Sequence, residues 1–147
     1  MLLYPRSIPA DKINVTGTLK MPNGWQYATA LPVDFQTPDS VTFKPVSLEK
    51  FVDSPAMIGV NFKKIVLSND GVLHELDIAA ENEKDLEFTS ETLAGWKNLV
   101  KQANVMFGAR HYNSYRFLLT LSDFGGREGL EHHESSEDGV GKDALRD

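Results

Sequence analysis

The chain contains no cysteine among its 147 residues. Disulfides, thiolate zinc sites and cysteine nucleophiles are therefore excluded, while the redox compartment stays open. Long apolar runs are also missing, so no segment of the sequence is suited to span a bilayer. The N-terminal stretch "MLLYPRSIPADK" is interrupted by Pro5 and Pro9 and lacks the continuous apolar core of a signal peptide, so the sequence leaves the localisation of the protein unknown.

Positive charge is scarce as well. The 15 lysines and arginines stand against 21 aspartates and glutamates, a net charge of -6. A surface that binds nucleic acid or anionic lipid needs a basic stripe, and the sequence shows none, so we expect neither a nucleic-acid nor a membrane partner. At this length a chain buries roughly 70% of its unfolded surface, which is enough for one ordinary core.

Along the chain, segments in which apolar residues recur at strand spacing are followed by segments with helical spacing, and this succession predicts an α+β fold. Strands are predicted at residues 13–20, 25–33 and 40–46, the first two paired as a hairpin through the turn "MPNG". A short helix behind Ser47 follows, and we place an internal boundary between residues 46 and 47. A second strand pair, "FKKIVL" and "VLHELDIAAE", is joined by the tight turn "SNDG".

The clearest helix runs from Ser90 to Phe107. Ser90 is a plausible N-cap, Gly108 is a plausible left-handed terminator, and an apolar stripe at i, i+3 and i+4 spacing predicts packing on a sheet. After it, the continuous apolar stretch from Phe117 to Leu121 is typical of a strand covered on both faces. "LEHH" is expected to form a short edge strand, and the acidic residues 134–147 are expected to be a flexible tail.

The segment "GLEHHESSE", residues 129–137, concentrates the residues suited to chemistry. His132 and His133 are adjacent, so on a strand they point to opposite faces, and one metal ion would be reached by only one of them. A self-contained zinc site is therefore disfavoured. The other two histidines, His74 and His111, stand singly in a strand and a loop, and we interpret both as hydrogen-bonded structural residues.

Three glutamates in the same region could divide acid and base roles if they were held near one another. On a strand, however, Glu128 and Glu134 lie on the face opposite to Glu131. Solvated charges on an edge strand are therefore the favoured interpretation of Glu128 and Glu134.

Several segments together resemble the glycyl aminopeptidase family of zinc metallopeptidases. They are "YP" at residues 4–5, "MPNGWQYATALP" at 21–32, "FVDSP" at 51–55, "FGARHYNSYRFLL" at 107–119, and "GLEHHESSE" with "GVG" at 139–141. The segments occur in the order of the family along nearly the whole chain. Members resemble thermolysin-like peptidases, with an N-terminal β domain, a catalytic domain containing a zinc helix, and often a C-terminal PDZ domain.

The resemblance implies a division of the chain. Residues 1–46 would be the end of the N-terminal β domain, and residues 47–133 the opening subdomain of the catalytic domain, a mixed sheet packed by one long helix. The family's His-Glu-x-x-His motif is absent from the 147 residues. We therefore expect a fragment with no catalytic residue and no cofactor of its own. Zinc would belong to the full-length protein, and the remainder of the parent polypeptide would be its partner.

The resemblance also assigns the substrate-binding residues. In related zinc aminopeptidases, the glutamate of a Gly-x-Met-Glu-Asn edge strand binds the free α-amine of the peptide. Gly129, Leu130, Glu131 and His132 resemble that segment, with Leu for Met and His for Asn. Strand alternation would put Gly129, Glu131 and His133 on the cleft face.

These observations predict a fragment of a zinc-dependent aminopeptidase that supplies the substrate-binding edge strand and is inactive alone. Two alternatives stay open. One is a non-catalytic β-rich module that binds a peptide or protein through its edge strand. The other is a small hydrolase that uses Glu131 with His133.

Overall fold

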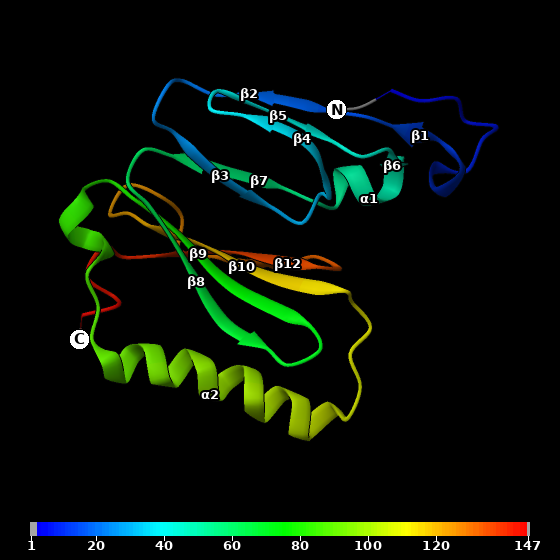
Figure 1. The fold of residues 1–147 in the computed structure, drawn as a ribbon. Coiled ribbons are helices and arrows are strands. Elements are labelled where there is room, and N and C mark those ends of the chain that lie inside the picture. The colour runs from blue at the N-terminus through cyan, green and yellow to red at the C-terminus, as the bar shows by residue number, and fades with distance from the viewer. Residues whose placement is uncertain (1–2, 147) are drawn as a thin grey trace.

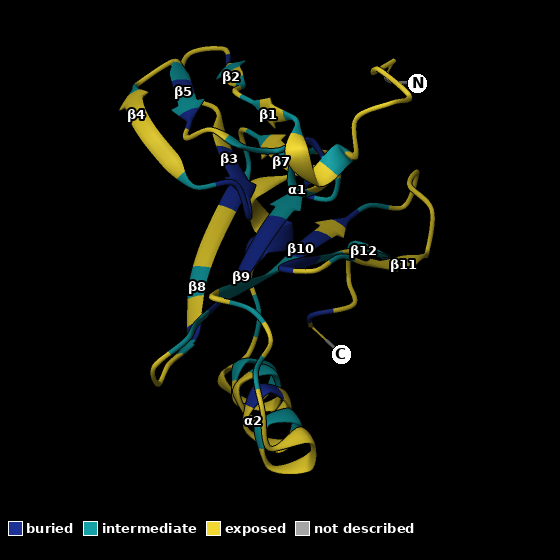
Figure 2. Ribbon diagram, turned by 90° about the vertical axis from the view of Figure 1, so that its right-hand side faces the viewer, coloured by how far each residue is buried: buried dark blue, intermediate teal, exposed yellow. Residues whose placement is uncertain are grey.

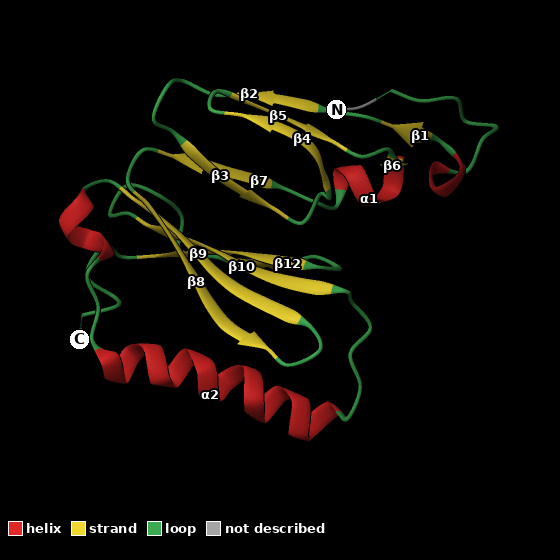
Figure 3. Ribbon diagram, in the orientation of Figure 1, coloured by secondary structure: helices red, strands yellow, loops and turns green. Residues whose placement is uncertain are grey.

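The chain folds into layers of strands with one long helix, and the predicted α+β class is confirmed. The computed structural model describes residues 3–146. In Figure 1 the N-terminal strands form an upper layer, a five-stranded sheet lies beneath them, and the helix α2, Ser90–Phe107, runs below that sheet. Figure 3 shows how strands dominate both upper layers. None of the helices within residues 3–146 is both long and apolar enough to cross a membrane.

The upper layer is built from short antiparallel strands. Its elements are η1 (Ala10–Lys12), β1 (Asn14–Val15), β2 (Thr18–Lys20), β3 (Gln26–Thr29), β4 (Val33–Thr37), β5 (Ser40–Phe43), β6 (Val46–Ser47), α1 (Leu48–Val52) and β7 (Ala56–Gly59). In the described part of the chain, β1 pairs with β6, β3 pairs with β7, and β5 lies between β2 and β4. Met21, Tyr27, Leu31, Val41 and Phe43 form the buried core of this layer.

The hairpin predicted between residues 13–20 and 25–33 is wrong. Strand β2 pairs with β5, and β3 pairs with β7. The reason lies in the burial of β3, because Tyr27 packs into the upper core while Ala28 packs with Phe62 and Leu118 of the sheet below. A strand that needs cover on both faces sits between the two layers, and turn chemistry in "MPNG" does not decide its partner.

The five-stranded sheet and its helix make up the rest of the structure. Its elements are β8 (Phe62–Asn69), β9 (Leu73–Ala80), η2 (Glu83–Leu86), α2, β10 (Ser114–Leu121), β11 (Gly129–Glu131) and β12 (Ser135–Val140). The strand order is β11-β12-β10-β9-β8. Strand β10 is parallel to both of its neighbours, whereas β8 and β11 run antiparallel to theirs. The predicted β8–β9 pair is confirmed, with Gly71 at φ 75° in its turn.

Strand β10 and helix α2 both contribute to the main core, together with β8 and β9, and the predicted packing of the helix on a sheet is confirmed. Trp96 of α2 meets Phe117 of β10 edge to face, with ring centroids 5.4 Å apart. Leu119 and Leu121 are buried on the same side, while Leu118 packs toward the upper layer. The helix has the predicted bounds and ends at Gly108, φ 63°, but its N-cap is Thr89, whose hydroxyl accepts from Thr92 N–H.

The flexible tail predicted for residues 134–147 is wrong. Residues Ser135–Val140 form β12, which lies between β10 and β11, and Ser135 is fully buried. The composition of this segment correctly indicates that it buries little apolar area. It does not reveal that β12 is also held by backbone hydrogen bonds to strands on both sides. Leu145 adds to the main core, and Asp147 lies outside the described residues. The boundary placed between residues 46 and 47 stays a prediction.

Candidate functional site

Strand β11 is an edge strand, as the sequence predicted for this segment. Within residues 3–146 it pairs only with β12, through the register Gly129–Asp138, Leu130–Glu137 and Glu131–Ser136. All of its residues are exposed, and Figure 2 shows β11 at the margin of the sheet, away from α2. Such an edge offers backbone N–H and C=O groups to an extended peptide.

The face of β11 that carries Glu131 is acidic. Residues paired across two strands share a face, so Glu131 lies on the same face as Ser136 and as Asp138, two residues further along β12. Ser136 Oγ donates a hydrogen bond of 2.7 Å to Asp138 Oδ2. Burial raises the pKa of Tyr115, and the negative charges of Asp138 and Glu131 raise it further. A cationic group would therefore meet two carboxylates on this face.

The opposite face of the hairpin turns toward the upper layer. Leu130 lines a pocket of about 430 Å³ together with Met57 and Leu118. His132 lies between two carboxylates, with Nδ1 3.1 Å from Asp53 Oδ1 and Nε2 3.3 Å from Glu137 Oε2. The four predicted substrate-binding residues are thus contiguous, but their side chains divide between the two faces.

His133 does not follow the predicted alternation. Strand β11 ends at Glu131, and residues 132–134 form the turn to β12, where His132 N–H bonds to Ser135 O at 2.8 Å. The backbone N–H of His133 donates to Asp53 Oδ2 at 2.9 Å, and both histidines line the same pocket. The expectation that His133 shares the face of Glu131 is therefore wrong, because alternation holds only within a strand.

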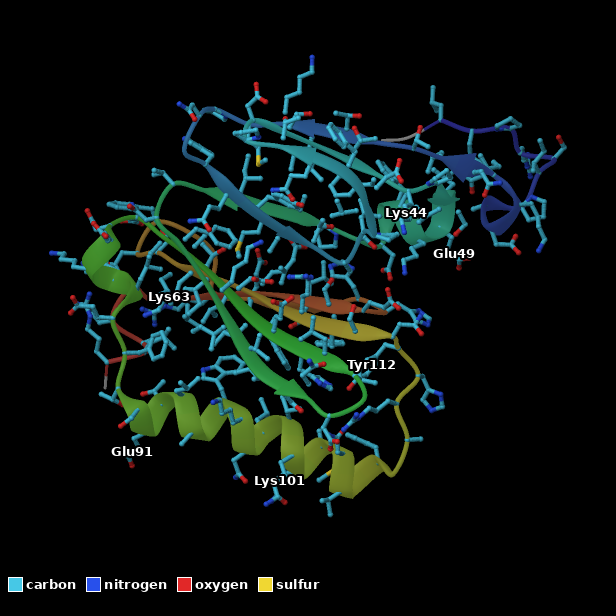
Figure 4. The ribbon with its side chains drawn as sticks, in the orientation of Figure 1. Lys44, Glu49, Lys63, Glu91, Lys101 and Tyr112 are labelled. Atoms are coloured by element: carbon cyan, nitrogen blue, oxygen red, sulfur yellow. The ribbon has the colours of Figure 1, made fainter. Side chains whose placement is uncertain are left out.

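A second pocket, of about 560 Å³, lies between this turn and α1. It is lined by Ser47, Glu49, Lys50, Val52, Asp53, Ser54, His132, His133 and Glu134. Figure 4 labels Glu49 on α1, at the side of the molecule where the turn lies. The pocket joins two segments that are distant in sequence, since Lys50 and Glu134 are 84 residues apart.

The interpretation of Glu134 as a solvated charge is wrong. Only 9% of the residue is exposed, and Lys50 Nζ donates to its Oε2. Its Oε1 accepts from Asn113 N at 3.3 Å and from Asn113 Nδ2 at 3.4 Å. Burial acts to raise the pKa of Glu134, but the bonds from Lys50 and Asn113 and the charge of Lys50 together lower it. Glu128, by contrast, is exposed as expected.

Sequence reasoning missed Asp53, Lys50 and Asn113 as partners of the turn. None of them lies within reach of a local motif, because each contact joins segments separated by 21 residues or more. Asp53 and Lys50 belong to the short helix α1 and its C-cap, which sequence periodicity assigned only a structural role. Their presence beside "GLEHHESSE" is a product of how the layers stack.

The two remaining histidines, His74 and His111, differ in burial. His74 is 2% exposed, and its Nδ1 lies 3.0 Å from Val72 O while its Nε2 lies 3.0 Å from Tyr112 Oη. Because a carbonyl only accepts, Nδ1 carries the proton and Nε2 accepts from Tyr112, labelled in Figure 4. Burial lowers the pKa of His74, so the predicted structural role is confirmed. His111 is exposed.

No group of three or more histidine, aspartate or glutamate side chains within residues 3–146 is arranged to hold a metal ion. The described residues therefore do not fit a zinc site. The expectation that zinc belongs to the full-length protein stays a prediction.

Comparison with known proteins supports the resemblance noted in the sequence. Residues 1–60 match the profile of the peptidase M61 N-terminal domain. The fold is similar to that of an aminopeptidase N family protein from Idiomarina loihiensis, with a TM-score of 0.72 and 20% sequence identity. That match covers 92% of this chain but only 23% of the other, so the chain spans a minor part of that protein. No curated protein matches the chain significantly.

Glycyl aminopeptidases are the M61 peptidases. The match over residues 1–60 therefore confirms the resemblance to the glycyl aminopeptidase family of metallopeptidases for that part of the chain.

Proposed function

We propose that this chain supplies the substrate-binding edge strand of a zinc-dependent aminopeptidase, with Glu131 pairing with the free α-ammonium group of a peptide. One observation carries the proposal. Glu131 is exposed at the end of an edge strand, on a face that it shares with the carboxylate of Asp138. A charge-assisted bond to an ammonium group at that position would mark the end of the bound peptide.

The geometry favours an extended peptide that adds to the sheet beside β11. Backbone groups of β11 would bond to the peptide backbone, and the small Gly129 leaves the start of the strand open to a close approach. The hairpin turn at residues 132–134 lies beyond Glu131, where α1 stands next to it. In the complete enzyme, zinc held by residues outside the 147 would polarise the peptide carbonyl.

Changing Glu131 to Gln is expected to weaken binding of a peptide with a free N-terminus by about tenfold, because the amide oxygen of Gln can still accept a hydrogen bond but no longer carries the negative charge that strengthens the bond to the ammonium group. Glycyl-alanine amide and its N-acetylated form are suitable probes, with binding followed by amide chemical shifts of β11 in NMR titrations. The acetylated peptide should bind the wild-type chain and the Glu131→Gln variant equally. Glu128→Gln removes an exposed carboxylate just before β11 and serves as the matched control.

Equal losses for the free and acetylated peptides would reject the amine-anchor role of Glu131. A wild-type chain that binds both peptides alike would instead favour a non-catalytic module that uses the exposed edge of β11 without reading the N-terminus.

The chain by itself is expected to bind zinc weakly and to cleave no peptide. Both ring nitrogens of His132 already face carboxylates, and zinc needs three or four converging ligands. Calorimetric titration with zinc chloride is the direct measurement. Stoichiometric binding at micromolar affinity or tighter, abolished in a His132→Ala and His133→Ala double variant, would contradict this expectation.

A further inference from the structure

Helix α1 is fixed firmly in the upper layer, so its C-cap residue is a rigid point. Ser47 caps its start by accepting from Lys50 N at 3.1 Å, and Leu48 is buried. Phe51 packs against the upper core and lies so close to Gly17 that a Cβ there would come within 2.7 Å of its ring. Asp53 forms the C-cap and donates its N–H to Glu49 O at 3.1 Å.

The end of β11, in contrast, has little support of its own. The strand is only three residues long, it is exposed along its length, and its one neighbour within residues 3–146 is β12. Short edge strands of this kind open readily because few buried contacts hold them. Anything that fixes the residues directly after Glu131 therefore also fixes the direction in which Glu131 points.

Asp53 makes that connection from the other layer. Its Oδ2 accepts from the backbone N–H of His133 at 2.9 Å, and its Oδ1 lies 3.1 Å from His132 Nδ1. Burial acts to raise the pKa of Asp53, but the bonds and charges of the two histidines outweigh it and lower the pKa. The carboxylate of Asp53 thus contacts both residues that follow Glu131, His132 and His133.

We infer that Asp53 is a positioning residue for the peptide anchor: it holds the β11–β12 turn against α1 and so sets the place of Glu131 at the strand end. The inference rests on the proposed function of Glu131. The neighbouring bonds from Lys50 and Asn113 reach Glu134, at the far side of the same turn. Of these three residues, Asp53 bonds to the part of the turn that is nearest to Glu131 in sequence.

Two substitutions at Asp53 separate geometry from charge. Both Asp53→Asn and Asp53→Ala remove the negative charge. The amide of Asn keeps an oxygen that accepts from His133 N–H and an NH₂ group that can donate to His132, whereas Ala keeps neither. Free-amine glycyl-alanine amide is expected to bind Asp53→Ala about tenfold more weakly than wild type, and Asp53→Asn within about twofold of wild type.

The same titrations, run on the full 147-residue chain, also include Glu49→Ala. Glu49 lies on the same helix and lines the same pocket, so this variant controls for the loss of a nearby charge. Amide hydrogen exchange gives a second readout: in Asp53→Ala, protection of the His133 amide is lost, while in Asp53→Asn it is kept. Should Asp53→Ala fail to fold by circular dichroism, Asp53→Ser, whose hydroxyl is one atom shorter than the carboxylate, carries the same expectation.

The outcomes are distinct. If wild type fails to prefer the free-amine peptide over the acetylated one, the function proposed for Glu131 is rejected, and the positioning role with it. If wild type shows the preference and Asp53→Ala keeps full affinity, only the positioning role is rejected. Equal losses in Asp53→Ala and Asp53→Asn would show that the charge acts directly on the ammonium group, which also overturns positioning.

Discussion

Gly139→Ala is expected to unfold the β11–β12 hairpin and to cost the whole domain about 3 kcal/mol of unfolding free energy. Gly139 lies in β12 where the loop from β10 folds back over it, and its N–H donates to Glu128 O at 2.8 Å. A Cβ at this position would come within 2.2 Å of the backbone oxygen of Gly126. The backbone of Gly126 cannot move aside as a flexible side chain can. The loop that contains Gly126 must therefore shift, which breaks the hydrogen bond from Gly139 N–H to Glu128 O.

The matched control is Gly95→Ala. Gly95 lies within α2, and a Cβ there would meet no atom within 4 Å. Alanine in a helix is more favourable than glycine by about 0.5–1 kcal/mol, so this variant should be slightly more stable than wild type. Urea denaturation of both variants measures the difference, and hydrogen exchange locates it in β11. A Gly139→Ala variant as stable as wild type would contradict the close approach of the loop.

Arg116→Met is expected to destabilise the protein by about 3–5 kcal/mol at neutral pH, because it leaves a buried carboxylate without its cation. Arg116 Nη1 lies 2.8 Å from Asp77 Oδ2, and its Nη2 lies 2.7 Å from Glu75 Oε2. Asp77 is fully buried, and its Oδ1 has no hydrogen-bond partner among the described residues. Lys64 Nζ, 5.0 Å from the centre of the Tyr27 ring, is the other cation that acts on this carboxylate.

The pH dependence follows from the direction of the pKa shift. Burial raises the pKa of Asp77 above the unfolded value, although Arg116 lowers it in part. A carboxyl with a raised folded-state pKa stabilises the fold most fully below its unfolded pKa, and that stabilisation is lost as the pH rises through the folded pKa. Removing Arg116 raises the folded pKa further. The deficit of Arg116→Met should therefore shrink as the pH falls from neutral toward 4.

Denaturation of Arg116→Met at both pH values is the measurement, and a second change provides the control. Adding Asp77→Leu to Arg116→Met removes the stranded charge and should recover much of the lost stability. Lys12→Met breaks the exposed ion pair between Lys12 and Asp11 and should leave the unfolding midpoint unchanged. A deficit in Arg116→Met that neither depends on pH nor recovers in the double variant would exclude the stranded charge as its cause.

The elements of the main sheet that could be predicted are those whose signals lie close together in sequence. The bounds of α2 and its left-handed end at Gly108 follow from a stripe and a terminator within one stretch of the chain. The turn between β8 and β9 at Gly71 and the buried strand β10 could likewise be predicted from signals within one short stretch. Even the N-cap of α2 is off by one residue only, because Thr89 and Ser90 offer the same hydroxyl.

The failures at β3, β12 and Glu134 are cases in which a distant segment decides. Strand β3 takes β7 as its partner because it needs cover on both faces, and β12 is ordered because β10 and β11 enclose it. Glu134 looked like a solvated charge because nothing near it in sequence pairs with it. Its partner Lys50 is 84 residues away.

The candidate site also has features that short segments of sequence predict and features that only tertiary contacts create. By itself the sequence determined that "GLEHHESSE" contains an edge strand, a signal within one short segment, and that the chain resembles glycyl aminopeptidases, a signal carried by several short segments in order. Only the tertiary structure decided that Glu131 shares an acidic face with Asp138, that His133 belongs to a turn, and that Asp53 reaches that turn. Local rules act over a few residues, whereas these contacts exist only once two layers have packed and brought α1 against the end of β11.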